Sequence, residues 1–105
     1  MVFEEFAPFT RRVMELLDDD DLAKVQGLLL ARPDAGKVIP KSGGLRKLRV
    51  AAKGRGKRGG ARIIYYWVVD RDRILMLDIY AKNEKADLNA DELKQLRTLI
   101  EDYKT

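Results

Sequence analysis

The sequence has 105 residues, of which 46% are hydrophobic, and a formal net charge of +4 at pH 7. This length fits one domain over residues 1–105. Cysteine and histidine are both absent, which excludes disulfides, thiolate metal sites and the commonest catalytic base. The apolar runs are too short to cross a bilayer, and Glu4 and Glu5 stand where a signal peptide would carry positive charge. We therefore expect a cytoplasmic protein that makes no membrane contact.

Two helices are expected in the first third of the chain. Apolar residues at helical spacing predict the first helix over Pro8–Leu17, with the proline in its first turn. The acidic run Asp18–Asp21 ends this helix and caps a second one, which stops at Arg32 and Pro33. The two helices should form a hairpin, and the glycines and proline of residues 34–44 predict a loop after it.

Three strands and a helix are expected in the remainder. Leu45–Ala52 alternates apolar and basic residues, Ala61–Val69 is β-branched and aromatic, and Ile74–Tyr80 follows a polar turn. Asn89 and Glu92 resemble the capping box of a C-terminal helix. The predicted fold class is α+β, with an N-terminal helical hairpin, an antiparallel sheet of three to four strands and a C-terminal helix. The helices are expected to pack on one face of the sheet.

Positive charge is concentrated in one segment of the sequence. Ten of the 21 basic residues lie in Lys37–Arg62, which contains no acidic residue, so eleven bases face 17 acids elsewhere. A segment of charge +10 on a body of charge −6 favours a polyanionic partner. The alternative is a charge run that faces solvent or a protein partner.

The run Gly54–Gly59 formally matches the pattern G-x-G-x-x-G. A dinucleotide site needs a helix after these glycines, whereas here a strand is expected, and a P-loop needs Ser or Thr where Arg58 stands. We therefore predict a cationic hairpin loop that either contacts RNA phosphates or is a plain connector. The basic residues of this loop are Lys53, Arg55, Lys57 and Arg58.

Three cations can converge on one face of the predicted sheet. Lys47 and Arg49 share a strand face, and Arg62 opens the neighbouring strand, where cross-strand neighbours lie about 5 Å apart. The alternative is three separate solvated charges. Tyr66 has the same parity as Arg62, so it either stacks on a base or packs in the core.

Polar residues also occur at the end of the last predicted strand. Asp78 has the parity of Lys82 and either orients a cation or points to water. Lys82 and Asn83 follow the strand directly, where a site at the sheet edge would gather residues. The run Asp18–Asp21 lacks the spacing of a calcium loop and is explained by helix capping, so we expect no metal ion and no cofactor.

Three segments together resemble the RelE/ParE toxin superfamily, and within it the HigB-type toxins: Gly43–Val50, Gly59–Tyr66 and Ile79–Lys85. The resemblance implies an antiparallel sheet flanked by helices and a ribosome-dependent endoribonuclease that cuts mRNA in the decoding site. It also implies a HigA-like antitoxin that binds DNA, neutralises the toxin and represses the shared operon. Operator DNA would be reached only through that antitoxin.

The resemblance also implies roles for individual residues. The family's basic residues on its second strand match Lys47 and Arg49, and its arginine at the start of the third strand matches Arg62. Lys82 covers the cationic position after the last strand, and Asn83 stands where some relatives carry arginine. The catalytic tyrosine of some relatives has no counterpart in residues 87–90, which read Asp-Leu-Asn-Ala. This departure disfavours a tyrosine-centred acid–base scheme but leaves an electrostatic one intact.

The mechanism we expect is metal-independent attack by the RNA 2′-OH, with Arg62 stabilising the charge of the transition state. The base is a lysine made partly neutral by neighbouring cations, or the ribosome alone holds the RNA in reactive geometry. The alternatives are a ParE-like gyrase poison and a nonenzymatic RNA-binding module. The catalytic candidates are Arg62, Lys47, Lys82 and Lys57, and the RNA-binding candidates are Arg49, Lys53, Arg55, Arg58, Tyr66 and Asn83.

Overall fold

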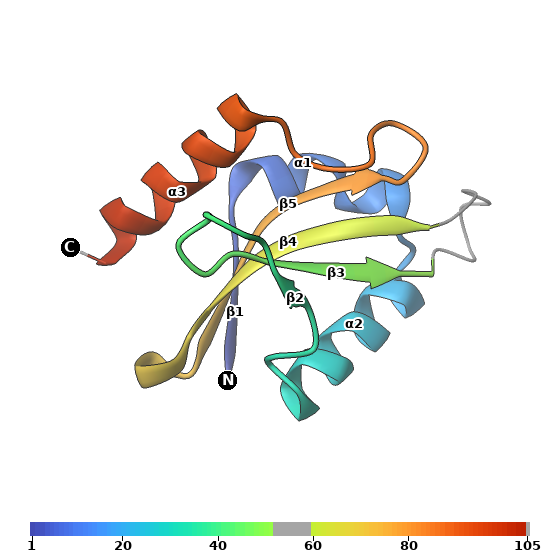
Figure 1. The fold of residues 1–105 in the computed structure, drawn as a ribbon. Coiled ribbons are helices and arrows are strands. Elements are labelled where there is room, and N and C mark those ends of the chain that lie inside the picture. Colours follow the sequence, from blue (N-terminus) through green and yellow to red (C-terminus); the bar gives the residue numbers. More distant parts are fainter. Residues whose placement is uncertain (52–59, 105) are drawn as a thin grey trace.

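The structure is a computed structural model that describes residues 1–51 and 60–104. Its elements follow one another in an order that begins with a strand and ends with a helix (Figure 1). They are β1 (Val2–Glu5), α1 (Ala7–Leu16), α2 (Asp19–Ala31), β2 (Lys37–Val38), β3 (Arg46–Val50), β4 (Ala61–Val68), a 3₁₀ turn η2 (Val69–Arg71), β5 (Arg73–Ala81) and α3 (Ala90–Lys104).

The strands form one five-stranded sheet in the order β1-β5-β4-β3-β2. Strands β2 to β5 pair in antiparallel fashion, whereas β1 lies parallel to β5, with Val2 opposite Arg73. The α+β class, the two consecutive N-terminal helices and the C-terminal helix are confirmed, but three to four strands is too few, and the sheet is mixed rather than antiparallel because β1 lies parallel to β5. β1 has only four residues, two of them glutamates, so its pairing with β5 rather than its own pattern makes it a strand.

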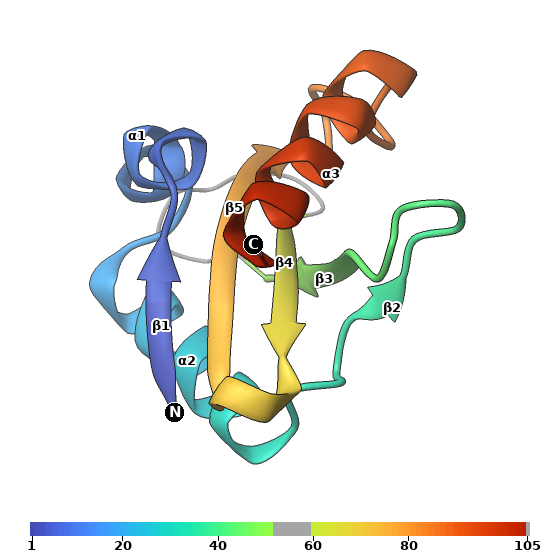
Figure 2. The same cartoon turned by 90° about the vertical axis from the view of Figure 1, so that its left-hand side faces the viewer.

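Helices cover both faces of the sheet, so the prediction that they pack on one face is wrong (Figures 1 and 2). α1 and α2 cover one face, where Phe9 and Leu29 pack with Ile63 and Tyr65. α3 covers the other face through Leu96 and Ile100. The physical reason is that β4 and β5 carry apolar residues at both parities, which is the pattern of strands buried on both sides.

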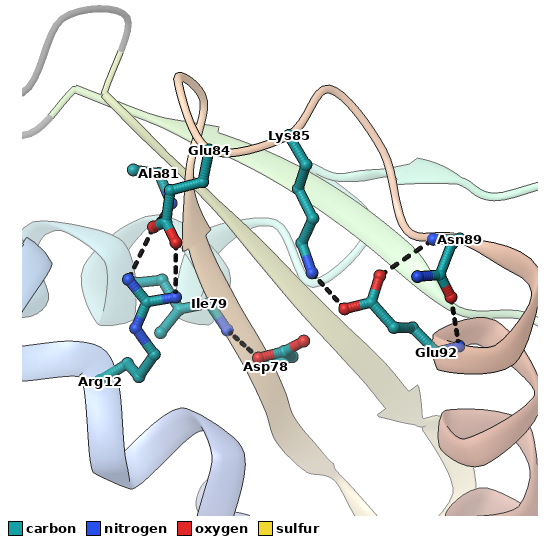
Figure 3. Close-up of polar contacts among 8 residues, drawn as sticks. All are labelled: Arg12, Asp78, Ile79, Ala81, Glu84, Lys85, Asn89 and Glu92. Carbon is teal, nitrogen blue, oxygen red and sulfur yellow. Dashed lines mark hydrogen bonds and ion pairs between the residues drawn. The ribbon is translucent and has the colours of Figure 1, made fainter.

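Reciprocal side-chain caps begin α2 and α3. The carboxylate of Asp18 accepts from the backbone N–H of Asp21 at 2.7 Å, and that of Asp21 accepts from Asp18. Asn89 and Glu92 exchange the same pair of bonds at α3, at 2.8 and 3.0 Å (Figure 3). Both caps agree with the sequence, because a short acceptor three residues before an acid satisfies two backbone donors at once.

A β-bulge in β5 sets which residues face α3. Ile64 lies opposite Asp78 but Tyr65 lies opposite Met76, so Leu77 is an extra residue in β5. Strict alternation from the buried Met76 would direct Asp78 into the core under α1 and α2. The bulge instead places Asp78 on the α3 face, beside Ile64.

Candidate nucleic-acid interface

Two adjacent rows of side chains cross β3, β4 and β5 on the α3 face of the sheet. In the first row, Arg49 lies opposite Arg62 and Arg62 lies opposite Tyr80; we call it the arginine row. In the second, Lys47 lies opposite Ile64, which lies opposite Asp78. Directly opposed residues of antiparallel strands have Cα atoms about 4.5–5.5 Å apart. The fold therefore gathers two arginines and, one row away, Lys47 on a single face.

The arginine row runs from solvent into the interior. Arg49 is exposed, Arg62 is 7% exposed and Tyr80 is 1% exposed. Nη1 of Arg62 donates to the carbonyl of Ala61 at 3.1 Å, which holds the guanidinium near the start of β4. Among the described residues Arg62 is the only buried basic one. A charge held in such a low-dielectric place interacts more strongly with an anion than an exposed charge does.

Lys47 is held by a carboxylate from the connection between β5 and α3. Its Nζ lies 2.5 Å from Oδ1 of Asp87, and the two side chains are 24% and 72% exposed. The charge in contact with this ammonium is therefore negative, although the sequence-based hypothesis relied on neighbouring cations to make a lysine neutral.

Tyr80 is a residue that the sequence analysis did not select. Its hydroxyl is buried and has no hydrogen-bond partner among residues 1–51 and 60–104. Burial, with the negative charge of Asp87, raises the pKa of Tyr80 to about 12, although Arg62 acts in the opposite direction. At neutral pH the phenol is therefore a hydrogen-bond donor and not a base. Its sequence signal is weak: one tyrosine among the aliphatic residues of β5, at the parity of Asp78.

A hollow of about 180 Å³ lies beside Tyr80, and we call it the Tyr80 hollow. Its lining combines apolar and polar side chains from the loop before β3, from β3 and β5, from the connection between β5 and α3, and from α3: Ile39, Pro40, Lys47, Tyr80, Asp87, Leu88 and Leu93. A second hollow, of about 450 Å³, lies along the outer side of β3 and is lined by Ala35, Lys37, Lys47, Leu48 and Arg49. Lys47 lines both, so it joins the outer basic surface to the Tyr80 hollow.

Ion pairs anchor the connection between β5 and α3 (Figure 3). Glu84 receives hydrogen bonds from Arg12 of α1 at 2.6 and 3.1 Å, and from the backbone N–H of Ala81 at 3.0 Å. Lys85 contacts Glu92, and this hydrogen bond lowers the pKa of Glu92. The ammonium of Lys85 also lies 4.9 Å from the centre of the Tyr80 ring. The connection is thereby fixed to both α1 and α3.

Asp78 lies between these anchors and is half-buried. Its Oδ1 accepts from the backbone N–H of Ile79 at 2.9 Å (Figure 3). Burial raises the pKa of Asp78, and this hydrogen bond and the charge of Lys85 oppose the rise. Asp78 therefore satisfies a backbone donor of β5.

The remaining candidates occupy different places. Lys82 and Asn83 are exposed in the connection after β5, where the N–H of Lys82 donates to the carbonyl of Gly60 at 3.1 Å. Tyr66 is partly buried in the cluster beneath α3, with the Lys104 ammonium 5.2 Å from its ring centre. Stacking a base on Tyr66 would therefore require α3 to move. The loop cations lie outside the described residues: Lys53, Arg55, Lys57 and Arg58.

The described part of the chain, residues 1–51 and 60–104, holds no group of three or more acidic side chains that could bind a metal ion. Within the same residues, every helix is too short or too polar to span a membrane.

Two comparisons relate this chain to known proteins. A family model described as "RelE toxin of RelE / RelB toxin-antitoxin system" matches residues 6–105. Among solved structures, the chain is similar to the E. coli toxin RelE, determined in the free state as a mutant with two arginines replaced by alanine. The TM-score is 0.58 at 11% sequence identity, over 81% of this chain and 86% of that one. At this identity the structural likeness shows a shared fold.

Proposed function

Because the chain belongs to the RelE toxin family, we propose that it is a ribosome-dependent endoribonuclease that cuts mRNA in the decoding site. The observation that carries this proposal is the arginine row, in which the exposed Arg49 leads to the buried Arg62 on the face that also holds Lys47. Arginine and lysine side chains bind phosphate oxygens, and a buried guanidinium does so with the least screening.

The proposed reaction uses the nucleophile that RNA carries. The 2′-oxygen forms a bond to the adjacent phosphorus and the bond to the 5′-oxygen breaks. The 5′-oxygen takes a proton from solvent, so the products are a cyclic phosphate and a 5′-hydroxyl. Arg62 stabilises the added negative charge on the phosphate, while Arg49 and Lys47 hold the flanking phosphates. Lys82 or Lys57 takes the 2′-OH proton, or the ribosome positions the RNA so that solvent suffices. The scheme requires no metal ion.

We further propose that the toxin is controlled by a HigA-like antitoxin that binds DNA, and that it reaches operator DNA only through this partner. The family description, which names a toxin–antitoxin system, supports such a partner. The site of action would be the cytoplasm, where translated mRNA is found. Asn83 and the loop cations Lys53, Arg55 and Arg58 are proposed as further RNA contacts.

Mapping mRNA 5′ ends after brief induction in cells tests the proposal. A reporter gene with its start codon is compared with the same gene without it, so that only translation differs. Cuts within codons of the translated copy alone support the ribosome-dependent nuclease. DNA damage without such cuts supports gyrase poisoning instead. The absence of both, with RNA binding retained, supports a binding module.

A further inference from the structure

Tyr80, which lines the hollow, carries a buried hydroxyl that the proposed cleavage reaction does not use. The phenol is 1% exposed, and its hydroxyl meets no acceptor in the described part of the chain. A buried hydroxyl without an acceptor destabilises the folded protein. An acceptor brought by a ligand would remove that cost, so the hydroxyl points to a ligand of the hollow.

The lining of the hollow defines the chemistry of that ligand. Ile39 and Pro40 come from the loop before β3, Leu88 comes from the connection between β5 and α3, and Leu93 comes from α3, so four apolar side chains line it. The polar lining consists of two donors, Tyr80 and Lys47, and one acceptor, Asp87. Only Oδ1 of Asp87 contacts Lys47, which leaves acceptor capacity on the carboxylate. The ligand therefore has apolar surfaces and an edge that carries both acceptors and N–H groups.

The size of the hollow limits the kind of ligand that it can bind. Its volume of about 180 Å³ is below the roughly 300–1,000 Å³ of sites for drug-sized ligands, and it suits one planar ring system. A free phosphate fits poorly, because the Asp87 carboxylate would repel it and the apolar side chains offer it no hydrogen bond.

We propose that the Tyr80 hollow binds one nucleobase of the RNA whose phosphates lie on the arginine row. Arg62 is the strand neighbour of Tyr80, so a nucleotide held there by its phosphate can place its base in the hollow. Apolar side chains then contact the base, and Tyr80 and Asp87 bind its edge, as in other recognition of unstacked bases. The hollow would thus set which nucleotide is preferred at one position of the cut. This inference rests on the proposed RNA substrate.

The test uses Tyr80→Phe, which removes the hydroxyl and keeps the ring, with Tyr103→Phe as a matched control on α3. The full-length protein is titrated with each of the four nucleoside 5′-monophosphates and followed by NMR. At least one nucleotide should shift resonances of Leu88 and Leu93, and Tyr80→Phe should weaken its binding about tenfold. Tyr103→Phe should bind as the wild type does. The melting temperature of Tyr80→Phe should stay the same or rise, because the unsatisfied hydroxyl is gone.

A second arm examines the mapped cleavage sites in cells. Wild-type cuts should share a base at one position, and both Tyr80→Phe and Asp87→Asn should relax that preference. Asp70→Asn removes the same charge from the exposed turn η2 and should leave the preference unchanged. Nucleotide binding and base preference that are independent of Tyr80 and Asp87 would overturn the inference. Because the titration involves no ribosome and no cleavage, it can fail while the nuclease proposal stands, and it can succeed if cleavage is absent.

Discussion

Two buried tyrosines on opposite faces of the sheet show how the two layers of the molecule differ. Under α1 and α2, the Tyr65 hydroxyl accepts from the N–H of Gly36 and donates to the carbonyl of Pro33, both at 2.8 Å. Under α3, the Tyr80 hydroxyl has no partner among the described residues. The α3 face also holds the buried Arg62, whereas the α1/α2 face has a different unsatisfied group, the indole N–H of Trp67, which meets no acceptor among the described residues. The two tyrosines therefore differ: Tyr65 links the segment after α2 to the sheet, whereas Tyr80 carries a hydroxyl that the described part of the fold does not use, on the face where we propose that RNA binds.

The largest effect is expected of Arg62→Ala, which tests whether the α3 face carries out the proposed cleavage. We expect toxicity to fall about 100- to 1,000-fold, the usual cost of removing a group that stabilises transition-state charge. Viability of cells after induction measures the effect. Arg62→Lys is the matched control: it keeps the charge but loses the bidentate geometry, so it should retain part of the activity. Full toxicity of a folded Arg62→Ala protein would remove Arg62 from the mechanism.

Tyr65→Phe tests how much the tyrosine on the α1/α2 face stabilises the fold. It leaves the N–H of Gly36 and the carbonyl of Pro33 without the hydroxyl, so we expect a loss of about 1–3 kcal/mol in the free energy of unfolding. Urea unfolding measures this loss. Tyr80→Phe, the equivalent change under α3, should cost nothing, and equal losses in the two variants would contradict the division into two faces.

Alkaline titration tests the burial of Tyr80. The unfolded chain ionises Tyr80 near pH 10, but the folded chain does so only at about 12. Ionisation of Tyr80 therefore has no effect on the free energy of unfolding below pH 10, and it lowers that free energy as the pH rises toward 12. Unfolding measured at pH 9 and pH 11 should show a smaller decline in Tyr80→Phe than in the wild type. An identical decline in both proteins would contradict this assignment.

The smallest expected effect is that of a chelator. The slow cleavage of a short RNA that a high toxin concentration gives without the ribosome should be the same with and without EDTA, because Lys47, Arg49 and Arg62 supply the positive charge. Product formation is read on a gel. A rate that falls on adding EDTA and recovers with excess Mg²⁺ would overturn the metal-independent scheme.

The sequence predicts those features that depend on neighbouring residues. The acceptors at Asp18 and Asn89 identify the starts of α2 and α3, since a cap is a local hydrogen-bonding problem. Alternation in β3 places Lys47 and Arg49 on one face. Arg62 lies on the same face because it is the residue of β4 directly opposite Arg49.

Features that depend on distant pairing could not be predicted in this way. β1 is a strand only because β5 lies beside it, and the bulge at Leu77 appears only when β4 and β5 are paired. Tyr80 stands out because no described residue accepts a hydrogen bond from its hydroxyl, and the residues next to it in the sequence do not indicate this. Whether the described hydrophobic clusters make residues 1–105 one domain stays a prediction.

The pairing of β1 has a consequence for the order in which the chain is synthesised. Val2 is made before its partner Arg73, which comes 71 positions later. The ribosome makes the chain from its N-terminus at about 5–20 residues per second. β1 is therefore unpaired until β5 has been made. Arg49 and Arg62 likewise lack Tyr80 until β5 has been made. A nascent toxin therefore completes its proposed RNA surface only after β5 has been made.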